Sequence, residues 1–204
     1  NAISQENQAK VKTVSMDMWL PYLNATEDIL PNAEVIHDRF HLVKYLNDAV
    51  DKVRRREVKK HEQLKNTKYL FLKNPQNQSE KQRIQFESIS GANYEVSRAW
   101  RVKENFRDLF GCSSFTEASS LVVHWITDAM RTKIKEIIDV VDTFLNHLRG
   151  IINAMLNTYT NAMAERLNGK IQEVKACGRG YRKFQNFRNA VLFFHGGLNL
   201  YPLK

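Results

Sequence analysis

The stretch Val11-Lys-Thr-Val-Ser-Met-Asp17 decides the fold class, because its polarity alternates and it closes on an acid. Such alternation is typical of a β-strand with one buried face. A helical stretch from Trp19 to Ile29 follows, and Ala33-Glu-Val-Ile-His37 forms a second short apolar run. Strand, helix and strand joined by short links predict a right-handed crossover between two parallel neighbours. Asp17 is therefore expected at the tip of a sheet strand.

The chain beyond residue 39 is predicted to be mostly helical. One helix face would carry Phe40, Val43, Leu46, Val50 and Val53. The rest of the same helix carries six bases, which are Lys52, Arg54, Arg55, Arg56, Lys59 and Lys60. A basic face of this kind is usually solvated and less often contacts phosphate.

The middle of the chain predicts three more helical segments. Trp100 falls in an apolar stripe between residues 96 and 110, which places it in the core. Ser114-Phe-Thr-Glu117 is a capping-box pattern at the start of a helix, whose buried face is expected to contain Leu121, Val122, Trp125 and Ala129. Apolar residues recur at intervals of three and four residues from Ile134 to Ile152, which predicts one long helix.

The C-terminal part joins a carboxylate to a strongly basic sequence. A helix is predicted from Asn157 to Lys175 with Glu165 on it, and Gly178 and Gly180 are expected to end it before a last amphipathic helix. From residue 165 to residue 188 the sequence contains seven Lys and Arg residues and two Glu residues, which gives a net charge of +5. This pattern indicates a polyanionic partner. The candidate phosphate-binding residues are Lys170, Lys175, Arg179, Arg182, Lys183 and Arg188.

Composition bounds the class of protein. The chain has 204 residues and 43% hydrophobic content, enough for a sizeable core in one domain or in one domain with a large insertion. Its net charge of +9 favours nucleic acid as a partner. Two cysteines are too few for a disulfide framework, and no apolar run approaches the roughly 18 residues of a membrane span. The sequence therefore predicts a soluble cytoplasmic protein without membrane contact.

Four ordered motifs together carry a resemblance to a known family. They are Val14-Ser-Met-Asp-Met-Trp19, His37-Asp-Arg-Phe-His41, Ala164-Glu-Arg-Leu-Asn-Gly-Lys170 and Gly178-Arg-Gly-Tyr-Arg-Lys-Phe184. From about Val11 to Phe194 the chain resembles the catalytic domain of bacterial insertion-sequence transposases of the ISL-three type, which are related to Mutator-like elements.

The resemblance implies a fold and a site. Such enzymes have a ribonuclease-H-like fold with an Asp-Asp-Glu triad that binds two Mg²⁺ ions. Asp17 matches the middle Asp and Glu165 matches the Glu, so both are implied to be catalytic and to bind metal. A helical insertion matches roughly residues 51–157. The expected fold class is α/β but predominantly α, namely a truncated ribonuclease-H-like fold with about two parallel strands and a large helical insertion.

The resemblance also implies an organisation in three parts. Residues 11–50 would form a partial ribonuclease-H-like core, residues 51–157 the insertion, and residues 158–195 the Glu-bearing helix with a basic C-terminal helix. The strand with the first Asp is expected upstream of Asp17, where the sixteen available residues contain no Asp. The chain is thus interpreted as the C-terminal part of a transposase that is inactive alone and acts on transposon ends and target DNA. The exposed edge of a shortened sheet predicts a homodimer or a higher oligomer.

Each candidate residue also has a structural interpretation. Asp17 could cap the following helix, and Glu165 could be a surface acid paired with a neighbouring base. His37, Asp38 and His41 could ligate a structural zinc if helical, but no Cys or third His lies nearby in sequence. The preferred interpretation is an active-site wall formed by Asp38 and Arg39 at the second strand tip, with Asp38 as the reserve metal-binding Asp.

Two hypotheses follow from these residues. The first is a DNA transposase fragment whose carboxylates hold Mg²⁺ against a phosphodiester. The alternative is a non-catalytic basic helical module that binds nucleic acid or a protein partner, in which Asp17 and Glu165 share no site.

Overall fold

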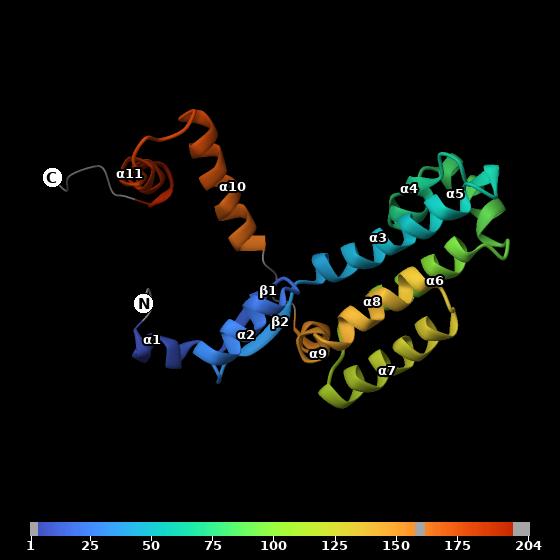
Figure 1. The fold of residues 1–204 in the computed structure, drawn as a ribbon, viewed down its shortest axis with the longest axis horizontal. Coiled ribbons are helices and arrows are strands. Elements are labelled where there is room, and N and C mark those ends of the chain that lie inside the picture. Colours follow the sequence, from blue (N-terminus) through green and yellow to red (C-terminus); the bar gives the residue numbers. More distant parts are fainter. Residues whose placement is uncertain (1–3, 158–161, 198–204) are drawn as a thin grey trace. The chain divides into compact units, whose positions relative to one another are not determined.

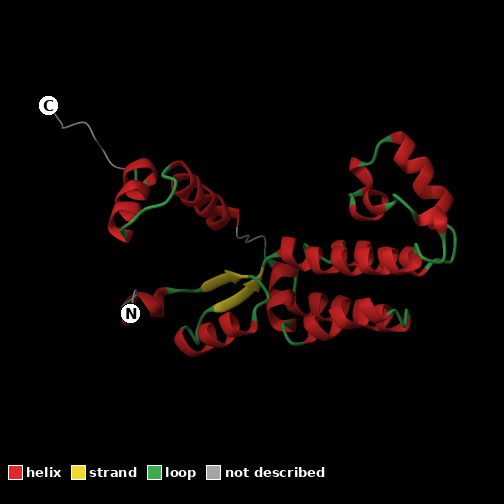
Figure 2. Ribbon diagram, turned by 45° about the horizontal axis from the view of Figure 1, so that its top comes forward, coloured by secondary structure: helices red, strands yellow, loops and turns green. Residues whose placement is uncertain are grey.

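The computed structural model describes residues 4–157 and 162–197 of the chain. These residues fall into two compact units, one up to residue 159 and one from residue 160, and each is described by itself below. Figure 1 shows the order of the elements along the chain, and Figure 2 shows helices and strands by colour. Among the described residues, no helix is both long and apolar enough to cross a membrane.

The first unit opens with the predicted strand, helix and strand. After the short helix α1 (Gln5–Lys10) come β1 (Thr13–Met16), α2 (Leu20–Ile29) and β2 (Glu34–His37). The two strands pair in parallel, with Thr13 opposite Glu34 and Met16 opposite His37, which confirms the predicted parallel pairing (Figure 2). β1 begins two residues later than predicted, because the Val11 N–H closes α1 on the carbonyl of Gln8.

Helix α3 (Arg39–Glu57) leaves the end of β2 directly and runs into the helical part. Leu42, Leu46, Ala49, Val50 and Val53 form its buried face. The inclusion of Phe40 in this face was wrong, since its side chain is 67% exposed. Asp38 caps the helix, so Phe40 lies in the uncovered first turn and Leu42 is the first core residue. The expected boundary at residue 51 falls inside this one helix.

The rest of the first unit is helical. Its elements are η1 (Glu62–Leu64), α4 (Lys68–Leu72), η2 (Pro75–Asn77), α5 (Glu80–Ser90), α6 (Glu95–Arg107), α7 (Phe115–Arg131), α8 (Lys135–Leu145) and α9 (Leu148–Leu156). α3 packs on α6 and α8, and α7 packs on α8 and α9 (Figure 1). Phe106 joins these helices, because its ring lies 4.8 Å from that of Trp125 and 5.3 Å from that of Phe144.

The apolar repeat from Ile134 to Ile152 forms two helices, so the prediction of one long helix was wrong. α8 ends at Leu145, and α9 starts after His147, whose backbone leaves helical geometry at φ −121°. The break redirects the chain, because α8 packs on α3 whereas α9 packs on β2. Asn153 fixes the second contact by donating from Nδ2 to the Val35 carbonyl at 2.8 Å. Periodicity alone carries no signal for this change of partner.

Helix caps agree only in part with the predicted box. The Ser114 hydroxyl accepts from the Glu117 N–H at 3.2 Å, as expected for the start of α7. The Glu117 carboxylate, however, accepts from the N–H of Ser113 at 2.8 Å, one residue earlier than predicted. A complete capping box occurs instead at α5, between Ser79 and Gln82. In α7, Val122, Trp125 and Ala129 are buried as predicted, whereas Leu121 is 37% exposed.

The second unit is a helical hairpin of α10 (Ala162–Cys177) and α11 (Phe184–His195). Asn157 is extended and closes α9, so the predicted helix does not start there, and residues 158–161 lie outside the described residues. The glycine break is confirmed: Arg179 has φ +49° and Gly180 φ +98°. Tyr181 folds back on Gly178, where an added Cβ would lie 2.5 Å from its ring.

Candidate active site

Asp17 follows β1 at the carboxyl end of the sheet. Its side chain is 51% exposed and faces a surface pocket of about 440 Å³. The other residues that line this pocket are Met18, Trp19, His41, Lys44, Tyr45 and Asp48. Four of them recur on α3 at positions 41, 44, 45 and 48, which is the spacing of one helix face. That spacing could have identified Lys44, Tyr45 and Asp48 from the sequence, which the strand-based reasoning missed.

Asp38 follows β2 at the same end of the sheet. Its backbone N–H donates to the Met16 carbonyl at 3.1 Å, so the two strand ends are held together. The Asp38 side chain is 4% exposed, and its Oδ1 accepts from the Phe40 N–H at 2.7 Å. Because that N–H is an otherwise unsatisfied donor in the first turn of α3, Asp38 has a clear structural role as a cap.

His41 connects the two carboxylates. Its Nδ1 lies 3.0 Å from Oδ1 of Asp17 and 3.8 Å from Oδ1 of Asp38. The ring is about a quarter exposed and stands on the first turn of α3. The structure therefore gathers two aspartates and one imidazole where two parallel strands end, as ligand sites often are in open parallel sheets.

Arg39 does not complete this wall as predicted. Its guanidinium donates to the Arg107 carbonyl at 3.3 Å and lies 4.2 Å from the centre of the Phe110 ring. Both contacts lie at the end of α6 and in the loop after it, and Arg39 is not among the residues that line the Asp17 pocket. A cation over an aromatic face beside a carbonyl is stable there, so Arg39 ties α3 to α6.

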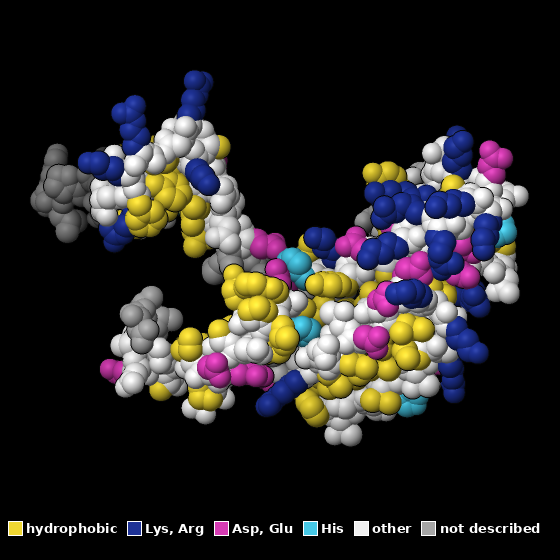
Figure 3. All heavy atoms as spheres, viewed as in Figure 1, with side chains coloured by type: hydrophobic (Ala, Val, Ile, Leu, Met, Phe, Trp, Pro, Cys, Tyr) yellow, Lys and Arg dark blue, Asp and Glu magenta, His cyan; other side chains and the backbone are white. Residues whose placement is uncertain are grey.

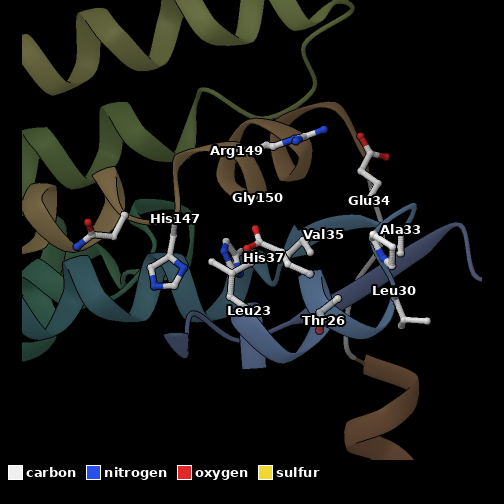
Figure 4. Close-up of a pocket in the computed structure, with 13 residues that line it drawn as sticks. Leu23, Thr26, Leu30, Ala33, Glu34, Val35, His37, His147, Arg149 and Gly150 are labelled. Carbon is white, nitrogen blue, oxygen red and sulfur yellow. The ribbon is translucent and has the colours of Figure 1, made fainter. Parts of the chain in front are cut away.

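His37 belongs to a different pocket, of about 220 Å³, between β2, α2 and the start of α9 (Figure 4). Its ring lies 4.9 Å from that of His147, and its Nδ1 lies 3.3 Å from the Met16 carbonyl. Burial, opposed by that hydrogen bond, lowers the pKa of His37 from 6.5 to about 4. Gly150 makes room for the ring, since a Cβ there would lie 2.5 Å from its Cδ2 atom.

The donor set suits a hard cation but is incomplete. Carboxylate oxygens such as those of Asp17 are the ligands that Mg²⁺ prefers. One oxygen of Asp38 is already occupied by the Phe40 N–H. Within the described residues, no group of three or more His, Cys, Asp or Glu side chains is arranged to hold a metal ion. Asp17 and Asp38 therefore fit part of a divalent metal site, which needs at least one more ligand.

Glu165 lies in the second unit, in the first turn of α10, where its side chain is exposed. Its position on a helix is confirmed, whereas its approach to Asp17 stays a prediction. Of the six candidate phosphate-binding residues, five are exposed and Lys170 is half-buried. None of the six forms an ion pair with a carboxylate in the part of the chain that the structure describes. Their charges are therefore available to an anionic partner.

Comparison with known proteins decides the family. The model of the ISL-three type family of DDE transposases, described as a transposase, matches residues 1–191. The chain belongs to this family. It is 23% identical over 186 residues to the transposase of insertion sequence element IS1001 from Bordetella parapertussis. That alignment covers 87% of this chain and 46% of the IS1001 transposase. The match to the IS1557 transposase of Mycobacterium tuberculosis is 24% over 213 residues, 91% of this chain and 48% of the relative.

This member of the transposase family therefore spans about half the length of the curated relatives it matches. No solved structure matches it. The family match confirms the resemblance carried by the four motifs, and with it the interpretation as an insertion-sequence transposase.

Proposed function

We propose that this chain carries part of the catalytic centre of a DNA transposase built on a ribonuclease-H-like core. The observation that carries the proposal is the placement of Asp17 and Asp38 at the carboxyl ends of two adjacent parallel strands, with Asp17 open to a pocket. Residues 11–50 and 158–195 would belong to the core, and residues 51–157 would form a helical insertion within it.

Asp17 and Glu165 would bind Mg²⁺, with Asp38 as the reserve ligand. When bound, two Mg²⁺ ions would activate water and then a DNA 3′-hydroxyl for in-line attack on phosphodiesters. Asp17 is suited to this role because its carboxylate is half exposed and its backbone position is fixed by the end of β1. The chain supplies two of three carboxylates, so we expect no strand cleavage by this chain alone.

The basic residues of the second unit would contact the phosphate backbone of transposon ends and target DNA. Support comes from the exposure of Arg179, Arg182 and Lys183 at and just after the hairpin turn, where the Gly178 and Tyr181 contact fixes the backbone. A preorganised turn loses less entropy on binding than a flexible tail.

A cleavage assay with the complete transposase tests the catalytic proposal. Labelled transposon-end DNA is incubated with Mg²⁺ and with Asp17→Asn, Glu165→Gln or Glu173→Gln. Glu173 is a matched control, because it is an exposed Glu on the same helix as Glu165. We expect loss of about 4 kcal/mol of transition-state stabilisation, or about a thousandfold in rate, for the first two and little change for the third. Full activity of Glu165→Gln would instead favour the non-catalytic basic module.

We also propose that the chain self-associates through its sheet. In the described residues the sheet has only two strands, so neither outer edge has a neighbouring strand. The Val35 carbonyl of β2 already accepts from Asn153, which leaves the outer edge of β1 as the more open one. Unpaired edges of this kind pair readily with another chain. Sedimentation of the purified chain at micromolar concentration should show a dimer or a larger species, and a monomer would contradict the edge argument.

A further inference from the structure

The positive charge of the first unit is concentrated in one segment, residues 52–107, called the basic arm below. It contains fifteen Lys and Arg residues against six Glu and no Asp, which leaves +9. The rest of the described first unit, residues 4–51 and 108–157, has eight bases against fourteen acids, which leaves −6. One compact unit thus has two regions of opposite sign, and so strong an asymmetry indicates an electrostatic footprint for a polyanion.

Ion pairs within the unit leave this charge largely uncompensated. Six of the fifteen bases form ion pairs in the described residues: Arg54 and Arg55 with Asp51, Arg56 with Glu95 and Glu136, Arg83 with Glu80, and Lys103 and Arg107 with Glu104. The buried Glu57 instead uses both carboxylate oxygens to accept from two backbone N–H groups at the start of α6. Eight exposed bases of the arm have no carboxylate within ion-pair distance in the described part of the chain: Lys52, Lys59, Lys60, Lys65, Lys68, Lys73, Lys81 and Arg101.

The arm presents these charges on a rigid scaffold. Leu64, Phe71, Val96 and Phe106 are fully buried beneath it. Lys103 is buried too, and its Nζ donates to the Phe71 carbonyl at 2.6 Å, which ties α6 to the end of α4. Lys and Arg side chains gather over α3, α4 and α5 in the space-filling view (Figure 3). A packed surface keeps its charges spaced before binding, unlike a disordered tail.

Spacing along α3 suits a phosphate backbone. Lys52 and Arg55 lie at i and i+3 in the last turns of α3 and share one face, and Lys59 follows in the turn after the helix ends at Glu57. Arg55 also pairs with Asp51 at 3.0 Å. Tyr69 is 62% exposed, and the Lys68 ammonium lies 5.9 Å from its ring centre, which adds a hydroxyl and a π-face beside the lysines. Phosphate contacts from Lys and Tyr position a protein on DNA without reading its sequence.

We propose that the basic arm is a second DNA-binding surface, separate in sequence from the bases of α10 and α11, which grips the backbone of duplex DNA without sequence preference. The choice of DNA rests on the proposed function. Since duplex DNA carries one negative charge per about 1.7 Å of axis, contacts along the arm would neutralise several phosphates at once.

The test uses the full chain, a fluorescent duplex of arbitrary sequence and a salt titration of anisotropy. The arm variant is Lys52→Gln with Lys59→Gln and Lys65→Gln, all exposed and without an ion pair in the described residues. The matched control removes three bases outside the arm that are likewise exposed and without an ion pair in the described residues, Lys12→Gln with Lys133→Gln and Arg149→Gln. Three lost phosphate contacts lower the slope of log affinity against log salt by about 2.7. The ratio of the DNA affinity of the unsubstituted chain to that of the arm variant should then fall by about fortyfold between about 50 and 200 mM salt.

Two outcomes would overturn the proposal. The arm variant could bind duplex DNA with the affinity and slope of the unsubstituted chain, while an Arg179→Glu, Arg182→Glu variant binds more weakly; that result removes the arm and leaves the proposed function intact. Alternatively, the arm lysines could govern binding to phosphatidylserine vesicles or to duplex RNA while leaving DNA binding unchanged. No DNA binding by the unsubstituted chain would count against the proposed function as well.

Discussion

Nδ1 of His41 lies 3.0 Å from Oδ1 of Asp17, so the first turn of α3 contacts the residue that directly follows β1. The buried side chain of Asp38 lies at the same junction, 3.8 Å from the same imidazole nitrogen. The start of α3 and the ends of both strands therefore contact one another. Substitutions at this junction affect both folding and catalysis, unless the replacement residue is chosen to separate the two effects.

Asp38→Asn and Asp38→Ala separate the cap from the charge. Asn caps a helix about as well as Asp, so Asp38→Asn should unfold like the unsubstituted chain. Asp38→Ala leaves the Phe40 N–H without its acceptor and should lose about 1–2 kcal/mol in urea unfolding. Asp28→Ala, at an exposed position of α2, is the control. If Asp38 binds metal, cleavage by the complete transposase should fall in both variants; full activity of Asp38→Asn would restrict Asp38 to capping.

Stability should fall as the pH drops below the usual pKa of histidine. Burial holds the pKa of His37 at about 4 in the folded chain, against 6.5 for a solvated histidine. As the pH falls, the unfolded chain therefore binds the proton before the folded chain does. The free energy of unfolding that neutral His37 contributes above pH 6.5 is lost progressively toward pH 4. We expect unfolding free energy to be about 2 kcal/mol lower at about pH 5 than at pH 8.

His37→Gln should flatten this pH profile, whereas His124→Gln, at an exposed position, should retain it. Some slope will remain in His37→Gln because burial also lowers the pKa of His147. A profile that His37→Gln leaves unchanged would show that another group governs acid unfolding.

Gly150→Ala should destabilise the first unit. The new Cβ would lie 2.5 Å from Cδ2 and 2.7 Å from Nε2 of His37, so the ring or α9 must shift, at a cost of about 1–3 kcal/mol. Gly169→Ala is the matched helical control, because a Cβ there meets nothing within 4 Å and Ala is the better helix former. Thermal unfolding of both variants checks the difference, and equal midpoints would be inconsistent with the packing of His37 on Gly150.

Glu57→Ala should weaken the contact between α3 and α6. The Glu57 carboxylate accepts from the N–H groups of Glu95 and Val96 at 2.9 and 2.7 Å, and its loss leaves two donors without this acceptor. We expect a loss of about 2–3 kcal/mol in urea unfolding. Glu62→Ala, at an exposed site, should change stability by less than about 0.5 kcal/mol. Similar values for the two variants would rule out this cap.

Charge reversal at Arg179 and Arg182 should weaken DNA binding and lower its salt slope by about 2, because two phosphate contacts are lost. Arg131→Glu with Lys135→Glu makes the same change in net charge on exposed residues of the first unit. Fluorescence anisotropy at several salt concentrations compares the two variants. Equal loss in both would mean that net charge, and not the hairpin turn, sets the affinity.

Local patterns predicted the elements of the sheet well. Alternation up to Asp17 and the apolar run before His37 indicated both strands and their parallel pairing, since each signal lies within a few residues. The family match likewise confirms the resemblance carried by short motifs such as the one around Glu165.

Tertiary contacts explain what the sequence patterns missed. Helical periodicity runs without interruption through Asn146 and His147, so it could not show that α8 and α9 pack on different elements. Arg39 adjoins Asp38 in sequence, but the carbonyl of Arg107 and the ring of Phe110 hold it elsewhere. Both partners lie far along the chain, where sequence spacing carries no distance information.

The hydrogen bond from Asn153 to the Val35 carbonyl joins residues 118 positions apart. At about 5–20 residues per second, a ribosome would make the partner of β2 roughly 6–24 s after β2 itself. Until α9 emerges, the Val35 carbonyl lacks its Asn153 donor and the His37 ring lacks the Gly150 backbone on which it packs. The nascent sheet can therefore bind chaperones or misassemble during this interval. The rate at which the intervening helices fold determines how long the sheet stays exposed.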